Sequence, residues 1–182
     1  TDAATAQLHR ATGGNPFFLL ETLRALLESG VWSRLGAAPV VLPLPDTVRQ
    51  AVIMRLQRLA PLARQVLEAA AVLDHLGARD LLYLTAGRDE AETVSATDEL
   101  LARQLLAETT TGFHFLHEMV RTVVYQQLSV GRRLLLHRRA AEALEKVYAP
   151  AIHLLLHANQ PGAALRRKIH VGEHVMSGLV HQ

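Results

Sequence analysis

The segment LLAETTTGFHFLH, residues 105–117, decides whether this chain is wholly helical or carries a small sheet. Thr109–Gly112 has the composition of a turn and lies between the short runs LLAE and FHF. A turn between two such runs predicts a β-hairpin. Helical patterns lie on both sides of it, so we expect a mainly α chain with one hairpin.

Three helical patterns precede the predicted hairpin: residues 61–74, 78–87 and 89–105. Three helices followed by a hairpin form the outline of a winged-helix domain. That name rests on the similarity of the outline alone.

The first 60 residues read as helices separated by turn residues. Gly13 and Gly14 end a first helix, Asn15 can cap the next, and Pro16 suits its first position. Apolar residues then recur at the spacing of one helix face: Phe17, Leu20, Leu23 and Leu27. After a proline-rich connector, Asp46 is expected to cap a helix with Val48, Val52, Leu56 and Leu59 on one face.

Composition excludes several classes of protein. Of the 182 residues 49% are hydrophobic and only 4% aromatic, which favours a helical core of Leu, Ala and Val. There is no cysteine, so disulfides, thiolate nucleophiles and Cys-based zinc sites are excluded. We expect a cytoplasmic protein without a membrane segment. A net charge of +2 is too small to indicate nucleic acid by itself.

Beyond the hairpin we expect helices over 117–128 and 131–148, then a helical pair turning at NQPG. Such a pair could begin a helical repeat array. The chain opens without Met and closes within a helical pattern, which indicates a piece of a larger protein.

Two stretches together suggest a family: ATGGNPFFLLETL at 11–23, and FHFLHEMVRTVVY at 113–125 followed by LSVGRRLLLHRRAAEALE. Their order and separation resemble the STAND group of AAA+-related signalling ATPases, especially the large ATP-binding bacterial regulators of LuxR type. The resemblance implies a helical lid over residues 1–60, a winged-helix domain over 61–147, and the start of a tetratricopeptide-like (TPR-like) region over 148–182.

The resemblance also implies a nucleotide site. The family's Gly-x-Pro motif, which lies against adenine, would be Gly14, Asn15 and Pro16. The family's Met-His-Asp-like motif, whose histidine reaches the β-phosphate of ADP, would be Leu116, His117 and Glu118. Here Leu replaces Met and Glu replaces Asp, and we expect Glu118 to point away from the phosphate. An imidazole N–H at a helix start suits a phosphate oxygen.

The catalytic part of such a protein is missing from these residues. No G-x-x-x-x-G-K-[ST] loop occurs, so we expect the ATPase core upstream, and no catalysis by this chain alone. ATP or ADP, with Mg²⁺ from that core, would bind the whole protein. Expected partners are the upstream nucleotide-binding domain of the same chain and an inducer or protein on the TPR-like region. DNA would be bound through another domain.

Two other functions remain open. A winged helix with a basic helix containing Arg132, Arg133, His137, Arg138 and Arg139 suggests a free-standing DNA-binding protein. The helical pattern 89–105 is acidic, which argues against its entering a DNA groove. His153 with His157 and His170 with His174 lie one helical turn apart, so they could bind a metal or serve a metallohydrolase. The H-E-x-x-H pattern fails at 117, because its last position is Arg121.

Overall fold

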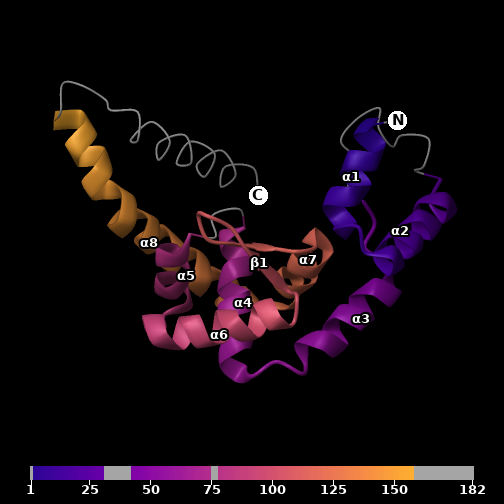
Figure 1. Ribbon diagram of the computed structural model, residues 1–182, viewed down its shortest axis with the longest axis horizontal. Helices are drawn as coiled ribbons and strands as arrows, with labels where there is room; N and C mark the ends of the chain where they lie inside the picture. The colour runs from indigo at the N-terminus through magenta and orange to yellow at the C-terminus, as the bar shows by residue number, and fades with distance from the viewer. Residues whose placement is uncertain (1, 31–41, 75–77, 158–182) are drawn as a thin grey trace.

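The computed structural model describes residues 2–30, 42–74 and 78–157 of the chain, with only the backbone described for 150–157. Over these ranges it contains eight helices and one two-stranded antiparallel sheet. The predicted mainly α class with a small hairpin is confirmed. Figure 1 shows the helices arranged around α4, with α1 and α2 at one end and α8 reaching away at the other.

The N-terminal part consists of three helices: α1 (Asp2–Thr12), α2 (Pro16–Glu28) and α3 (Asp46–Leu56). We call α1 and α2 with their connecting turn the α1–α2 arm, residues 2–28. The arm contacts the remaining helices through α3 and α7. The predicted apolar face of α3 is buried, with Val48 and Val52 fully inaccessible.

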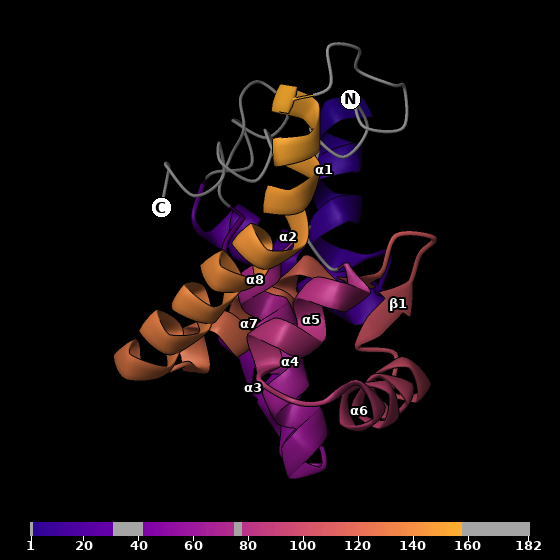
Figure 2. The ribbon, with the colours of Figure 1, turned by 90° about the vertical axis from the view of Figure 1, so that its left-hand side faces the viewer.

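Helix α4 (Pro61–Leu73) is the centre of the fold. Alanines and branched apolar residues recur along its sequence, and seven of its thirteen residues are buried. The small alanine side chains let neighbouring helices approach closely, so α4 packs against α5, α6, α7 and α8. Figure 2 shows α8 running across the side formed by α4 and α5.

The next two helices, α5 (Arg79–Ala86) and α6 (Glu90–Ala102), have well-defined ends. Helix α5 ends at Gly87, which has the left-handed φ of +68° that favours glycine. Helix α6 begins with a capping box, in which the Asp89 carboxylate accepts from the Glu92 amide at 2.8 Å. These local signals explain why both elements were predictable.

The predicted hairpin is present. Strands β1 (Leu106–Glu108) and β2 (Phe113–Phe115) pair antiparallel, with Ala107 opposite His114. The Thr109 amide donates to the Gly112 carbonyl at 2.7 Å and closes the turn. At the tip, Arg79 pairs with Glu108 and lies over the Phe113 ring at 5.5 Å, which ties the hairpin to the start of α5.

The hairpin leads into α7 (Glu118–Gln127) and α8 (Val130–His157). Helix α8 is longer than expected. We predicted that one helix ends near residue 148 and that another begins after it, but the structure has one continuous helix over both. Its 28 residues correspond to about 42 Å at 1.5 Å per residue. The predicted domain boundary at 147/148 therefore falls inside α8. The second half of the predicted helical pair, from residue 158 on, lies outside the described residues.

Two details of the prediction were wrong. Helix α2 buries Phe18, Thr22 and Leu26, whereas Phe17 and Leu20 of the predicted face are 47% and 53% exposed. Both faces carry helical spacing, and which one is covered depends on where α1, α3 and α7 lie. Asp46 is the first residue of α3 rather than its cap; Pro45 takes the cap position and has no side-chain hydrogen bond to give.

Thr85 in α5 offers a stability test. Its side chain is fully buried, and its hydroxyl has no hydrogen-bond partner among the described residues. Thr85→Val removes an unsatisfied hydroxyl with little change of shape, so we expect the free energy of unfolding to rise by about 1 kcal/mol. Thr93→Val is the matched control, because the Thr93 hydroxyl donates to the Asp89 carbonyl at 2.8 Å. That variant should lose about 1 kcal/mol. Urea denaturation of the two variants measures the change in the free energy of unfolding. Equal changes would contradict the conclusion that the Thr85 hydroxyl lacks a hydrogen bond.

Candidate functional site

The turn between α1 and α2 is built by two glycines and an asparagine. Gly13 and Gly14 have φ of +57° and +74°, and the Gly13 amide donates to the His9 carbonyl at 2.7 Å, which closes α1. The Asn15 side-chain oxygen accepts from the amides of Phe17 and Phe18 at 3.0 and 3.3 Å. The predicted helix stop, cap and Pro16 start of α2 are all confirmed.

His117 lies where β2 passes into α7, a hundred residues further along the chain. Its backbone is extended, with φ of −136°, and its carbonyl accepts from the Val120 amide at 2.9 Å in the first turn of α7. Its side chain makes no capping bond and is only 7% exposed. This histidine therefore points into the protein rather than toward solvent.

The ring of His117 is packed against the α1–α2 turn. A Cβ atom placed on Gly13 would lie 2.1 Å from His117 Nδ1 and 2.5 Å from the Leu116 carbonyl oxygen, so only glycine fits at position 13. The Phe18 ring meets the imidazole edge to face, with centroids 5.3 Å apart. One turn away, the Thr22 hydroxyl donates to the Phe18 carbonyl at 2.7 Å and lies 3.7 Å from Met119 Sδ. The tertiary structure thus brings the two motif segments into direct contact.

The surroundings of His117 favour its neutral form. Burial lowers the pKa of His117 below its usual range, and the positive charge of Arg55 lowers it further. The backbone carbonyls of Thr12 and Leu116 raise the pKa in part, because they lie where they favour a protonated ring. Nδ1 nevertheless is buried and makes no hydrogen bond of good geometry in the described structure. A buried ring nitrogen without a hydrogen-bond partner lowers stability.

The three residues predicted on the adenine side differ in what they can offer a ligand. Gly14 and Pro16 are exposed, and the His9 ring lies beside Gly14, 3.5 Å from where a Cβ would stand. Asn15 is half-buried, and its oxygen already caps α2. Asn15 therefore has only its NH₂ group left for recognition.

Glu118 is engaged by its own helix. Its carboxylate accepts from Arg121 Nε at 2.6 Å, and Arg121 also pairs with Asp74 at 3.2 Å at the end of α4. Arg121, which excluded the zinc-protease pattern, therefore neutralises the acid beside His117.

No family model, curated protein or solved structure matches this chain.

Gly13 and Phe18 surround His117 in the structure, whereas the sequence indicated Gly13 only as a helix stop and did not indicate Phe18. The pair Gly13–Gly14 could have indicated a close contact at Gly13. One glycine is enough to end a helix, so a second glycine suggests that a side chain would not fit there. Phe18 had no such signal, since it lies one position away from the apolar face that the spacing marked.

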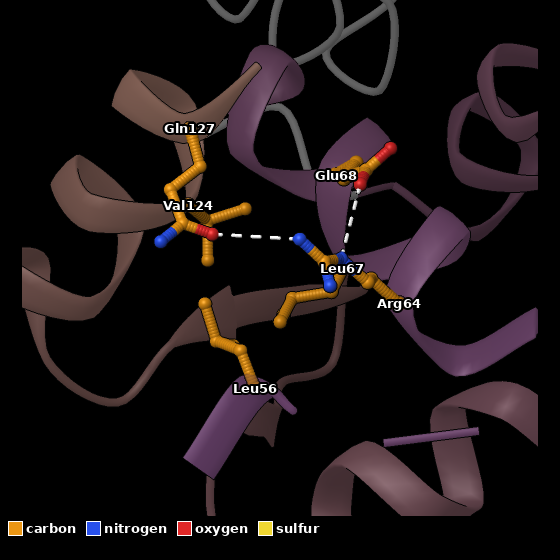
Figure 3. Close-up of a pocket in the computed structure, with 6 residues that line it drawn as sticks. All are labelled: Leu56, Arg64, Leu67, Glu68, Val124 and Gln127. Atoms are coloured by element: carbon orange, nitrogen blue, oxygen red, sulfur yellow. Dashed lines mark hydrogen bonds and ion pairs between the residues drawn. The ribbon is translucent and has the colours of Figure 1, made fainter. Parts of the chain in front are cut away.

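A pocket between α3, α4 and α7 is too small to be a ligand site. It is lined by Leu56, Arg64, Leu67, Glu68, Val124 and Gln127 (Figure 3). Its volume is about 10 Å³, room for at most one water molecule. Arg64, one of its lining residues, donates to Gln127 at 3.4 Å (Figure 3).

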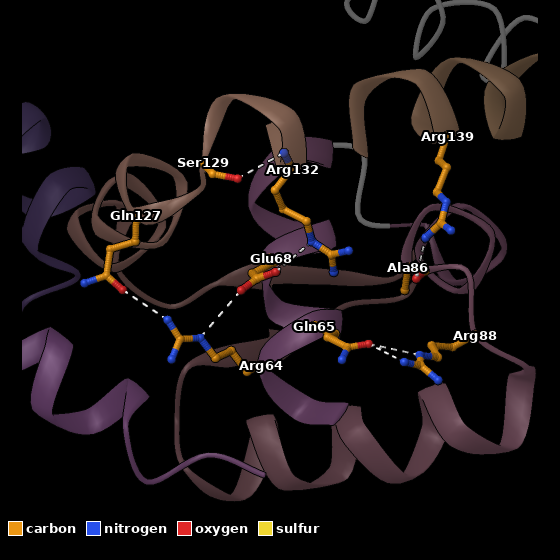
Figure 4. A network of polar contacts seen from close by, with 9 residues as sticks. All are labelled: Arg64, Gln65, Glu68, Ala86, Arg88, Gln127, Ser129, Arg132 and Arg139. Atoms are coloured by element: carbon orange, nitrogen blue, oxygen red, sulfur yellow. Dashed lines mark hydrogen bonds and ion pairs between the residues drawn. The ribbon is translucent and has the colours of Figure 1, made fainter. Parts of the chain in front are cut away.

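The basic stretch of α8 is used within the protein. Arg132 pairs with Glu68 at 3.1 Å, and Arg139 donates to the Ala86 carbonyl at the end of α5 at 3.1 Å (Figure 4). Arg133 lies over the Tyr125 ring at 5.0 Å, and His137 bonds the Tyr125 hydroxyl at 3.0 Å. These contacts fit a helix-packing face better than a DNA-binding one.

Metal ligands are not gathered in the part of the chain that the structure describes: no three His, Asp or Glu side chains there could share an ion. His170 and His174 lie outside the described residues. His153 and His157 belong to the described backbone of α8, but their side chains are not described. Among the described helices, none combines the length and apolar character needed to cross a membrane.

Proposed function

We propose that this chain is the regulatory segment of a STAND-type ATP-binding signalling protein that controls transcription. Residues 1–60 act as the lid of the nucleotide site, residues 61–147 as a winged-helix domain, and residues 148–182 begin a TPR-like region. The segment couples the exchange of ADP and ATP to a change of conformation and does not itself hydrolyse the nucleotide.

The observation that carries this proposal is the contact between Gly13 and His117. The two segments that resemble the family's nucleotide-contacting motifs are separated by a hundred residues, yet their side chains and backbone touch. A nucleotide held between an upstream core and this surface could meet Gly14 and Pro16 with its base and His117 with its phosphates.

The arrangement of helices also supports the winged-helix part. Helices α4, α5 and α6 pack on one another, and the β1–β2 hairpin follows them directly. The continuous α8 would join the winged-helix domain to the TPR-like region without a flexible linker. Movement of the winged-helix domain would then move the TPR-like region, as a conformational switch requires.

His117→Ala in the full-length protein tests the proposal. Loss of one imidazole–phosphate hydrogen bond should speed ADP release about tenfold, as a contact worth about 1.4 kcal/mol would. Basal signalling activity should rise, because the resting state loses a contact. Release of a fluorescent ADP analogue measures the rate. His114→Ala is the matched control, since His114 lies on β2 and is exposed.

Unchanged ADP release in His117→Ala would contradict the role of His117. The absence of a phosphate-binding loop in the gene upstream of Thr1 would contradict the proposal as a whole. Salt-dependent DNA binding by residues 1–182 would favour the DNA-binding protein instead, although the exposed face of α6 carries Glu90 and Asp98. Zinc retained through dialysis and lost in His170→Ala would favour the metal-binding alternative.

A further inference from the structure

The contact around His117 has a property that does not depend on nucleotide. Contacts between the α1–α2 arm and the β2–α7 junction include the His117 ring against Gly13 and Phe18, and Met119 beside Thr22. The arm also contacts α3, where the Thr47 hydroxyl donates to Glu21. The His117 ring is a buried titratable group in this contact. Its charge state therefore bears directly on whether the arm stays in place.

We propose that His117 is a proton-controlled latch: its neutral ring holds the α1–α2 arm against the junction of β2 and α7, and its protonation releases the arm. His117 is buried, with only 7% of the residue exposed. An imidazolium cation at this position would lose most of its hydration, and the carbonyls of Thr12 and Leu116 offset only part of that cost. Undocking the arm would restore that hydration.

Among the described residues, Arg55 carries the one side-chain charge that shifts the pKa of His117, and no carboxylate offsets it. The described titratable and charged side chains of the arm, of α3 and of the β2–α7 junction are, in chain order, His9, Arg10, Glu21, Arg24, Glu28, Asp46, Arg49, Arg55, His114, Glu118, Arg121 and Tyr125, with Asp74 beside them at the end of α4. Glu28 is exposed at the far end of α2, and Asp46 pairs with Arg49 at 3.8 Å. Glu21 pairs with Arg24 at 2.7 Å, and Asp74 and Glu118 both pair with Arg121, at 3.2 and 2.6 Å. Arg55 adds a positive charge that opposes protonation.

The direction of the pH effect follows from linkage. In the docked arrangement the pKa of His117 is below its usual value near 6.5, so the undocked arrangement binds the proton more readily. The contact is therefore at full strength above about pH 6.5 and weakens as the pH falls through and below that value.

Hydrogen exchange of the 182-residue chain without nucleotide tests the latch. Between pH 7.5 and 5.5, exchange in α1 and α2, corrected for the intrinsic pH dependence, should rise by up to about tenfold, as expected if only the undocked ring titrates at its ordinary pKa. Exchange in α4 and α6 is the internal reference, and its corrected rate should not change between pH 7.5 and 5.5. Equal rises in arm and core would overturn the latch.

Three variants assign the effect to a residue. His117→Gln, which cannot titrate, should abolish the rise, whereas His9→Gln and His114→Gln should retain it. His9 is the demanding control because its ring lies beside Gly14. A rise that persists in His117→Gln, or that disappears in His9→Gln, would overturn the proposal. If His117→Gln unfolds, the wild-type NMR titration of the His117 ring decides: its midpoint must coincide with arm release. This test uses no nucleotide, so it can fail while the proposed function stands.

Discussion

Gly13→Ala should be among the most damaging single substitutions in the described part of the chain. The new methyl group would lie 2.1 Å from His117 Nδ1 and 2.5 Å from the Leu116 carbonyl oxygen. The carbonyl is backbone and cannot turn aside, so the turn or the β2–α7 junction must shift. A positive φ costs a non-glycine residue about 1–2 kcal/mol, and overpacking adds about 1–3 kcal/mol. We expect a total loss of about 2–5 kcal/mol, measured as the free energy of unfolding or as faster exchange in the arm.

Gly30→Ala separates the two contributions. Gly30 has a φ of +69°, close to the +57° of Gly13, but a Cβ there would meet none of the described atoms within 4 Å. Gly30→Ala should therefore lower the free energy of unfolding only by the cost of the positive φ, about 1–2 kcal/mol. Equal losses for the two variants would show that His117 does not press on Gly13 in solution. That result would remove the observation on which the proposed function rests.

Leu67→Ala should be comparably damaging for a different reason. Leu67 is fully buried in α4, the helix against which four others pack. Removing three carbon atoms leaves a cavity that surrounding helices cannot fill without moving, which costs about 2–5 kcal/mol. Leu134→Ala in α8 is the control, because Leu134 is 68% exposed and should lose less than about 0.5 kcal/mol. Thermal and urea denaturation measure both. Similar losses would mean that α4 is not the centre of the core.

Most elements could be predicted because their signals are local. The Asp89 capping box, the Asn15 cap and the Gly87 stop are each satisfied by residues within four positions along the chain. The hairpin likewise closes between Thr109 and Gly112. Interactions of this range are encoded by spacing, so reading the sequence recovers them.

The length of helix α8 was predicted wrongly, since the sequence indicated a helix end near residue 148. Pro150 is a residue that disfavours helix interiors, yet it lies within α8. Helix α8 packs on α5 and α4, and it buries Leu136, Ala140 and Ala143. A local signal for ending a helix is overruled when most of that helix is already held by its neighbours.

The candidate site was predicted only in part. Gly14, Asn15, Pro16 and His117 were named from a resemblance, and the structure shows contact between His117 and Gly13, the residue before Gly14. The sequence offered no way to see that Gly13 and Phe18 enclose the ring, or that Arg121 neutralises Glu118 and Arg55 disfavours a charged ring. These relations join residues from different helices, and no spacing rule links them.

By itself, the sequence determined a mainly helical chain with one hairpin, the ends of most helices and the two motif segments. Only the tertiary structure decided that α2 buries Phe18 rather than Phe17, that α8 is continuous, and that the imidazole of His117 rests on Gly13. The physical reason is the distance along the chain between the residues that interact. Caps and turns are settled by bonds within a few residues, whereas burial, close contact and the charge state of a histidine depend on what the folded chain brings beside it.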